Sequence, residues 1–283
     1  MLSYLVVLAL EATRPFCKVP FRNWLSAGML TAGIIAHGTF LYYQFAQSLN
    51  GSGHLFADWF QWVQVGSFVL AIVCLVLLLR NPNTGVSLFL VPIILLLSVL
   101  GLLFREAGSF SIAPGQQVAL WRWVHTLSLL IGTVLIGLGA AFGGMYLVQA
   151  DRLKRKVGGL RKLKLPPLEF QQSVNRLCLL ATPVFLGVGM VSGILLKLSE
   201  SDSVPWFDGG IAATAILFLW SLLAAGWEFL SSGSLGGRRS ARLAIANFLF
   251  MMMVLLALVL SSHGLAGQGE ESSPMQSPAE VSS

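Results

Sequence analysis

Long apolar runs recur along almost the whole sequence and limit the folds that the chain can adopt. Seven runs between Trp24 and Ser261 have about 20 residues each, the length that an α-helix needs to cross the hydrocarbon core of a bilayer. Only hydrogen-bonded helices can carry such runs through lipid. The sequence therefore predicts an all-α, polytopic membrane bundle of about eight transmembrane helices, or seven if the short run from Leu2 to Leu10 does not insert. The expected full-length spans are 24–44, 59–79, 86–104, 125–148, 177–196, 210–230 and 243–261.

The composition agrees with a membrane protein and leaves no room for a soluble domain of any size. Of the 283 residues, 55% are hydrophobic and 11% are charged, and the mean hydropathy is +0.78. We expect one transmembrane domain over residues 1–266 and a disordered polar tail over 267–283, which is rich in Ser, Pro, Glu and Gly. The three cysteines share no short spacing. This argues against a disulfide framework, a cysteine metal cluster and a Cys-x-x-Cys redox site.

The positive charge is concentrated in a few connectors. The segment 151–176 holds eight Lys and Arg residues against Asp151 and Glu169. By the positive-inside rule this segment should be cytoplasmic, which places the chain in a cell membrane with both of its ends outside. A lipid- or RNA-binding patch is the alternative, but the rule already explains the charge, so we expect the lipid bilayer and no nucleic acid as a partner.

This topology brings all four histidines toward the outer leaflet. His125 opens the fifth span, His263 follows the eighth, and His54 lies in the outer connector after the second. His37 is about 13 residues into a helix that starts inside, and therefore lies about 20 Å across the membrane. Two glycine pairs at helical spacing, Gly139 with Gly143 and Gly189 with Gly193, predict close helix packing.

Histidines beside tryptophans at one membrane surface favour haem ligation. Neutral imidazole binds iron axially, and Trp121, Trp123 and Trp206 would supply aromatic walls for a flat apolar macrocycle. Zinc is the rival metal, but the histidines have no zinc-site spacing. A b-type transmembrane cytochrome would carry histidine pairs deep in the bundle. A transporter is a third alternative, although the spans show no clear inverted repeat.

The order and spacing of several motifs resemble the CcsA-type cytochrome c assembly proteins, from about Arg22 to Gly264. The motifs are Ser52-Gly53-His54, Val65-Gly66-Ser67, Trp121-Arg-Trp-Val-His125, Leu165-Pro-Pro-Leu168, Gly237-Arg-Arg-Ser-Ala241 and Ser262-His263-Gly264. The resemblance implies that His125 and His263 are the axial ligands of a haem, expected as haem b. It also implies a partner membrane protein of cytochrome c assembly and an apocytochrome c as further partners.

The chain departs from the full assembly proteins in their outer tryptophan-rich motif. It offers Val204-Pro-Trp206-Phe-Asp-Gly-Gly210 in that place, and the next span has no histidine. This is similar to the shorter HemX-like branch. The resemblance thus implies a haem-handling protein of c-type cytochrome biogenesis, with a non-catalytic regulator or scaffold of tetrapyrrole synthesis as the alternative. No catalytic residue is predicted, so the protein is at most one component of a haem-attachment complex.

Overall fold

The computed structural model describes residues 1–14, 21–50, 59–103, 116–155, 164–200, 209–230 and 236–268. These residues form eight helices and no strand, which confirms the predicted all-α bundle. The helices are α1 (Leu2–Ala12), α2 (Arg22–Asn50), α3 (Trp59–Arg80), α4 (Ser87–Leu103), α5 (Gln116–Arg155), α6 (Leu168–Glu200), α7 (Gly209–Leu230) and α8 (Gly236–Gln268).

Six of the described helices are long and apolar enough to cross a membrane, so the chain is a multi-pass membrane protein. They are α2, α3 and α5 to α8. Helix α4 has 17 residues and a length of about 25 Å, just short of the roughly 30 Å hydrocarbon core. Helix α1 has 11 residues and reaches about half that thickness. Its Tyr4, Val7 and Glu11 are nevertheless buried against the bundle.

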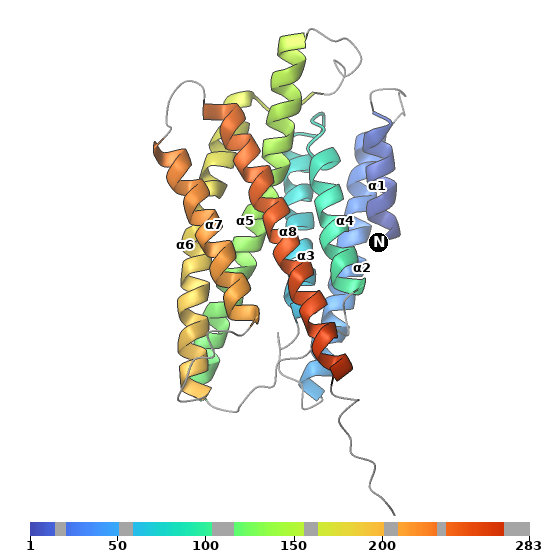
Figure 1. The fold of residues 1–283 in the computed structure, drawn as a ribbon. Coiled ribbons are helices and arrows are strands. Elements are labelled where there is room, and N and C mark those ends of the chain that lie inside the picture. Colours follow the sequence, from blue (N-terminus) through green and yellow to red (C-terminus); the bar gives the residue numbers. More distant parts are fainter. Residues whose placement is uncertain are drawn as a thin grey trace, which may run out of the picture.

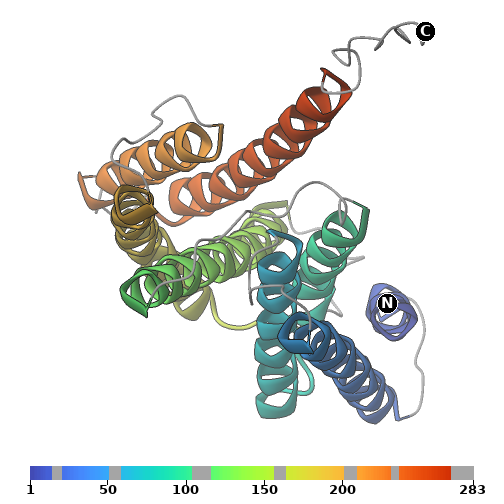
Figure 2. The same cartoon turned by 90° about the horizontal axis from the view of Figure 1, so that it is seen from below.

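Helix α5 is the central element of the fold. It packs against α3 and α4 on one side and against α6 and α8 on the other. Figures 1 and 2 show the first four helices gathered on one side of α5 and the last three on the other, with α8 crossing α5 obliquely. The largest apolar core runs through both sides and includes Leu70, Leu97, Met145 and Met251, all almost fully buried.

The predicted glycine contacts are confirmed. A Cβ on Gly143 would lie 2.8 Å from the carbonyl oxygen of Ala241 in α8, and one on Gly139 would lie 3.2 Å from Cβ of Cys178 in α6. A Cβ on Gly189 would lie 2.8 Å from the side chain of Leu129. Real Cβ atoms essentially never approach other atoms to 2.8 Å, and few approach to 3.2 Å. Glycine therefore sets how near these helices come to α5, as expected for small residues at membrane helix interfaces.

Four predicted boundaries were wrong because helices continue past the membrane-buried part of their sequence. Helix α5 begins at Gln116, so His125 lies within the helix instead of opening it. It also continues to Arg155, and α6 already starts at Leu168, so much of the expected basic connector is helical. Helix α8 begins at Gly236, seven residues before the predicted start of its span at 243. Arg and Lys are good helix formers, and hydropathy does not detect helix outside the lipid.

Helices α1, α3, α5 and α7 end, and α2, α4, α6 and α8 begin, at the same end of the molecule (Figure 1), and most of the described basic residues lie near these helix ends. We name this the basic end. Its described cations are Arg14, Arg22, Arg80, Arg152, Lys154, Lys164, Arg176, Arg238, Arg239 and Arg242. At the opposite end, the described side chains include only two cations, Arg122 and Lys197.

Specific polar contacts hold the basic end together. Arg14 bonds the buried Glu11 carboxylate at 3.1 Å and also donates to the Thr84 carbonyl at 2.8 Å. The amide of Gly85, in the turn between α3 and α4, donates to the Lys164 carbonyl at 2.8 Å. Backbone from the two sides of the bundle is thus joined directly at this end.

Candidate functional site

The imidazole of His125 is held against the backbone of α6. Its Nδ1 lies 2.7 Å from the carbonyl oxygen of Gly189. One turn further along α6, a Cβ on Gly193 would lie 2.8 Å from Cε1 of the same ring. Gly193 therefore leaves the space that the ring occupies, whereas Gly189 leaves room for the side chain of Leu129 and supplies the carbonyl that bonds the ring.

The hydrogen bond fixes the tautomer of His125. A carbonyl oxygen can only accept, so Nδ1 carries the proton, and the neutral ring keeps its lone pair on Nε2. Metal-binding histidines usually show this arrangement, in which one ring nitrogen donates to a carbonyl and the other binds the metal. The Gly189 carbonyl also accepts from the Ser192 hydroxyl at 2.9 Å. The backbone of α6 thus holds the His125 ring in one orientation, with Nε2 as the nitrogen that can bind a metal.

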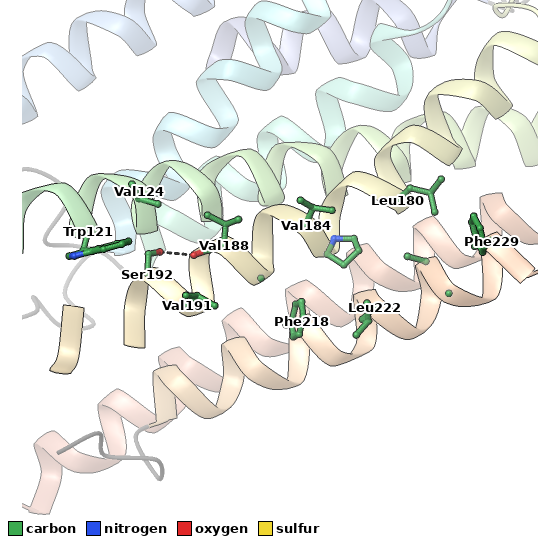
Figure 3. A pocket seen from close by; sticks show the side chains of 14 residues that line it. Trp121, Val124, Leu180, Val184, Val188, Val191, Ser192, Phe218, Leu222 and Phe229 are labelled. Carbon is green, nitrogen blue, oxygen red and sulfur yellow. Dashed lines mark hydrogen bonds between the residues drawn. The ribbon is translucent and has the colours of Figure 1, made fainter. Parts of the chain in front are cut away.

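An apolar pocket of about 690 Å³ lies between α5, α6 and α7, and His125 does not itself line it. Its wall includes Trp121 and Val124 from α5, Val188 and Ser192 from α6, and Phe218 and Leu222 from α7 (Figure 3). Its lining side chains Val184, Val191 and Phe229 are more than half exposed, so the pocket opens on the lipid-facing surface. A flat apolar molecule can contact this wall without leaving the hydrocarbon.

The predicted tryptophans divide into three cases. Trp121 lines the pocket one turn before His125. Trp123 lies on the same helix with 45% of its surface exposed and does not line the pocket. Trp206 lies outside the described residues. Trp121 is therefore the one predicted tryptophan that the structure places beside both the pocket and His125.

His37 belongs to a different cluster, between α1, α2 and α3. Its Nδ1 is 3.4 Å from the hydroxyl of Tyr4, and its ring meets Phe68 edge-on with centroids 5.5 Å apart. Its Nε2 is buried and has no hydrogen-bond partner. Nearby on α3 and α4, the hydroxyls of Ser67 and Ser98 are bonded at 2.9 Å. His37 packs inside the first half of the bundle, whereas His125 packs against α6.

The remaining two histidines cannot be placed as side chains. His54 lies outside the described residues, and for His263 only the course of α8 through Gln268 is described. The start of α5 and the end of α8 lie at the same end of the molecule but diverge from one another (Figures 1 and 2). The axial pairing of His125 with His263 therefore stays a prediction. Among the described residues, no three His, Cys, Asp or Glu side chains form a group that could hold a metal ion.

Arg122 is a candidate that the sequence reasoning missed. It lies between Trp121 and Trp123, three residues before His125, and its Nη2 is buried with no hydrogen-bond partner. Its position in the sequence could have revealed it, because this arginine opens an apolar span at the end opposite the basic segments. Positive-inside counting does not explain a cation there.

No protein-family model, curated protein or solved structure matches this chain. The resemblance to CcsA-type assembly proteins accordingly stays a prediction. Two described features bear on haem binding, namely the oriented imidazole of His125 and an apolar pocket that Trp121 lines but His125 does not.

Proposed function

We propose that the protein is a membrane haem-handling protein of c-type cytochrome assembly and that His125 binds the haem iron. The observation that carries this proposal is the 2.7 Å bond from Nδ1 of His125 to the Gly189 carbonyl. It leaves Nε2 as the nitrogen with a lone pair, in a ring held between two helices. The absent side chain at Gly193 on α6 leaves the room that this ring occupies.

Each part of the site has a distinct role in this proposal. Bound haem would supply an iron with two axial positions and a flat apolar macrocycle. His125 would bind the iron, and its hydrogen bond to α6 would keep the ring from turning away. Trp121 and the pocket wall exclude water from one flank. His263 remains the proposed second ligand, while His37 and His54 are proposed as accessory positions in handling.

The proposed topology follows from the charges. The described cations at the basic end outnumber those at the opposite end ten to two, which favours a cytoplasmic basic end. His125 then lies in the outer half of a cell membrane, where haem would be presented to an apocytochrome c or to a partner membrane protein. The described residues bind and orient a ligand in this proposal, so we propose no bond-forming step on this chain.

The first test is the absorption spectrum of the detergent-purified protein loaded with haem. We expect a bound-haem spectrum that is lost or shifted in His125→Ala, since the proposed ligand is removed. His37→Ala is the matched control, because it removes a histidine of the other half of the bundle. Size-exclusion profiles check that each variant stays folded.

The outcomes are separable. His263→Ala should also change the spectrum if the two histidines share one iron. A wild-type spectrum in His125→Ala would overturn the ligand assignment. A wild-type protein without a haem spectrum would overturn the proposed function.

The second candidate is a regulator or scaffold of tetrapyrrole synthesis that acts through the basic end. It is favoured by one specific observation, namely that α5 extends to Arg155 and carries its own cations, including Arg152 and Lys154, at that end. This candidate predicts that neutralising Arg152 and Lys154 alters tetrapyrrole levels in cells. The haem spectrum of the purified protein should stay unchanged by the same substitutions.

A further inference from the structure

His37 and His125 differ in the group that their Nδ1 atom contacts. Nδ1 of His125 faces a backbone carbonyl, which can only accept, so the neutral ring is held in one tautomer. Nδ1 of His37 makes a long hydrogen bond of 3.4 Å with the Tyr4 hydroxyl, which can either donate or accept. Both neutral tautomers of His37 are therefore compatible with this contact, whereas only one tautomer of His125 is compatible with its own.

His37 lies deep in a membrane-spanning helix. Helix α2 has 29 residues, and His37 stands near its middle, about 20 Å from either end. Its Nε2 is buried and makes no hydrogen bond, although the Gln64 side chain interacts with the ring. Tyr4 and the amino group of Met1 act on the ring from α1, and Phe68 packs on it from α3. A titratable group at this depth is costly to hold without a function.

Further titratable side chains lie between His37 and the basic end. Tyr4 and Glu11 share the buried face of α1 and are about 10 Å apart along its axis. The Cys74 thiol of α3 is fully buried and interacts electrostatically with both of them. The Glu11 carboxylate is paired with Arg14 at the basic end. Side chains that can carry a proton therefore continue from His37 to this end.

Polar side chains also lie on the other side of His37, toward the start of α3. Gln64 donates to the Ser98 carbonyl of α4 at 2.9 Å, and the Ser98 hydroxyl donates to the Ser67 hydroxyl at 2.9 Å. Gln61, about one turn nearer the start of α3, is buried as well. Helices α1 to α4 thus each contribute buried or half-buried polar groups to one series, which runs from the start of α3 to the basic end.

Helix packing alone does not call for these residue types. Ser and Gln can join membrane helices by hydrogen bonds without introducing a titratable group. Around α5 to α8, the hydroxyls of Thr133, Thr182 and Ser221 bond the backbone of their own helices instead. Series of carboxylates and histidines within membrane helices mark proton relays. The residue types along α1 to α4 therefore favour proton transfer over packing.

We propose that helices α1 to α4 conduct protons and that His37 is the transfer site. A proton arrives at one ring nitrogen and leaves from the other, while the Tyr4 hydroxyl exchanges a proton with Nδ1. From Tyr4 the proton passes through the Cys74 thiol to the Glu11 carboxylate at the basic end. Each step breaks one N–H, O–H or S–H bond and forms another, so no oxidant or reductant is needed.

The first test measures proton flux into liposomes that hold the full-length protein and a pH-sensitive dye, driven by a potassium diffusion potential. His37→Gln should lower the flux by on the order of tenfold to a hundredfold, because a positioned proton-transfer group contributes at least that much. Tyr4→Phe should also lower the flux, and it keeps the ring that lies against Gly33. Size-exclusion profiles check that both variants stay folded.

Tyr42→Phe is the matched control, because Tyr42 lies on α2 with 69% of its surface exposed. It should conduct like wild type. Wild-type flux in His37→Gln would overturn the proposal, and so would a wild-type protein whose liposomes conduct no better than empty ones. A loss of flux in Tyr42→Phe equal to that in Tyr4→Phe would overturn the assigned path.

The second test observes the two imidazoles directly by nitrogen NMR of the protein labelled with ¹⁵N-histidine. Signals are assigned by their loss in His37→Gln and in His125→Gln. His125 should show one tautomer with the proton on Nδ1, whereas His37 should exchange between both. A single fixed tautomer of His37 would overturn its role as a transfer site. These outcomes are separate from those for haem, because His37→Ala is expected to keep the haem spectrum.

Discussion

Single residues fix the basic end of the bundle, and Arg14 is the clearest case. Its guanidinium lies 3.1 Å from the Glu11 carboxylate, donates to the carbonyls of Thr84 and Pro82, and bonds the Asn23 side chain. The Ser26 hydroxyl donates to the other Glu11 oxygen. One arginine thus ties α1 both to α2 and to the turn between α3 and α4.

Replacing Arg14 by Ala should destabilise the protein strongly, because the Glu11 carboxylate would stay buried without its cation. The expected loss is on the order of 3 kcal/mol of unfolding free energy, as for other broken buried pairs. Arg80→Ala is the control, because Arg80 is exposed at the end of α3. Thermal unfolding in detergent gives the comparison. Equal melting temperatures of the two variants would contradict a stabilising role of the Arg14–Glu11 pair.

For single residues, the sequence predicted which side chains carry chemistry better than it predicted which groups they contact. The sequence singled out His125 because a titratable side chain at the membrane edge needs a reason. It could not show that Gly189 would accept from Nδ1, since 64 residues separate the pair. Arg122 was missed because a lone arginine beside an apolar span looks like an ordinary anchor until its buried, unpaired Nη2 is seen.

At the scale of helices, two glycines have different roles: Gly143 on α5 allows close packing with α8, and Gly193 on α6 leaves room for the His125 ring. A Cβ on Gly143 would press on the backbone oxygen of Ala241, whereas a Cβ on Gly193 would press on the movable ring of His125. Gly143→Ala should therefore lower the melting temperature, because helix α8 must shift. Gly193→Ala should leave melting nearly unchanged but weaken haem binding, because the imidazole is displaced.

Gly28→Ala is the control for both substitutions, since a Cβ there meets nothing within 4 Å. It should melt at or above the wild-type temperature, because alanine favours helix by up to about 1 kcal/mol over glycine. If Gly143→Ala melts like Gly28→Ala, the close approach of α5 and α8 is not a constraint. If Gly193→Ala binds haem like wild type, the seat of His125 on α6 is not needed.

The helices themselves were largely predictable and their ends were not. Apolar runs located all seven helices from α2 to α8, six of which are long and apolar enough to cross a membrane, because lipid leaves little choice of structure for such runs. Hydropathy stops at the membrane surface, so it missed the helical turns 116–124 and 149–155 of α5 and the basic start of α8. The domain over 1–266 and the disordered tail over 267–283 stay predictions, because 269–283 lies outside the described residues.

For the whole molecule, the charge asymmetry predicts which face meets the cytoplasm. In a background without native cysteines, Lys154→Cys at the basic end should resist a membrane-impermeant thiol reagent added to intact cells. Ser199→Cys, exposed near the end of α6 at the opposite side, should react. Opening the cells should make Lys154→Cys reactive as well, which controls for its intrinsic reactivity. Labelling of both sites in intact cells would contradict a cytoplasmic basic end.

The 40 residues of α5 make it about 60 Å long, twice the thickness of the hydrocarbon core. A single rigid rod therefore carries the imidazole near one water surface and the last cations of the helix at the other. His125 and Arg155 are separated along it by about 45 Å. Over that lever arm, a tilt of about 5° at the histidine moves the far end by about 4 Å. A change in the tilt of α5 at the level of His125 is therefore geometrically coupled to the position of the basic end.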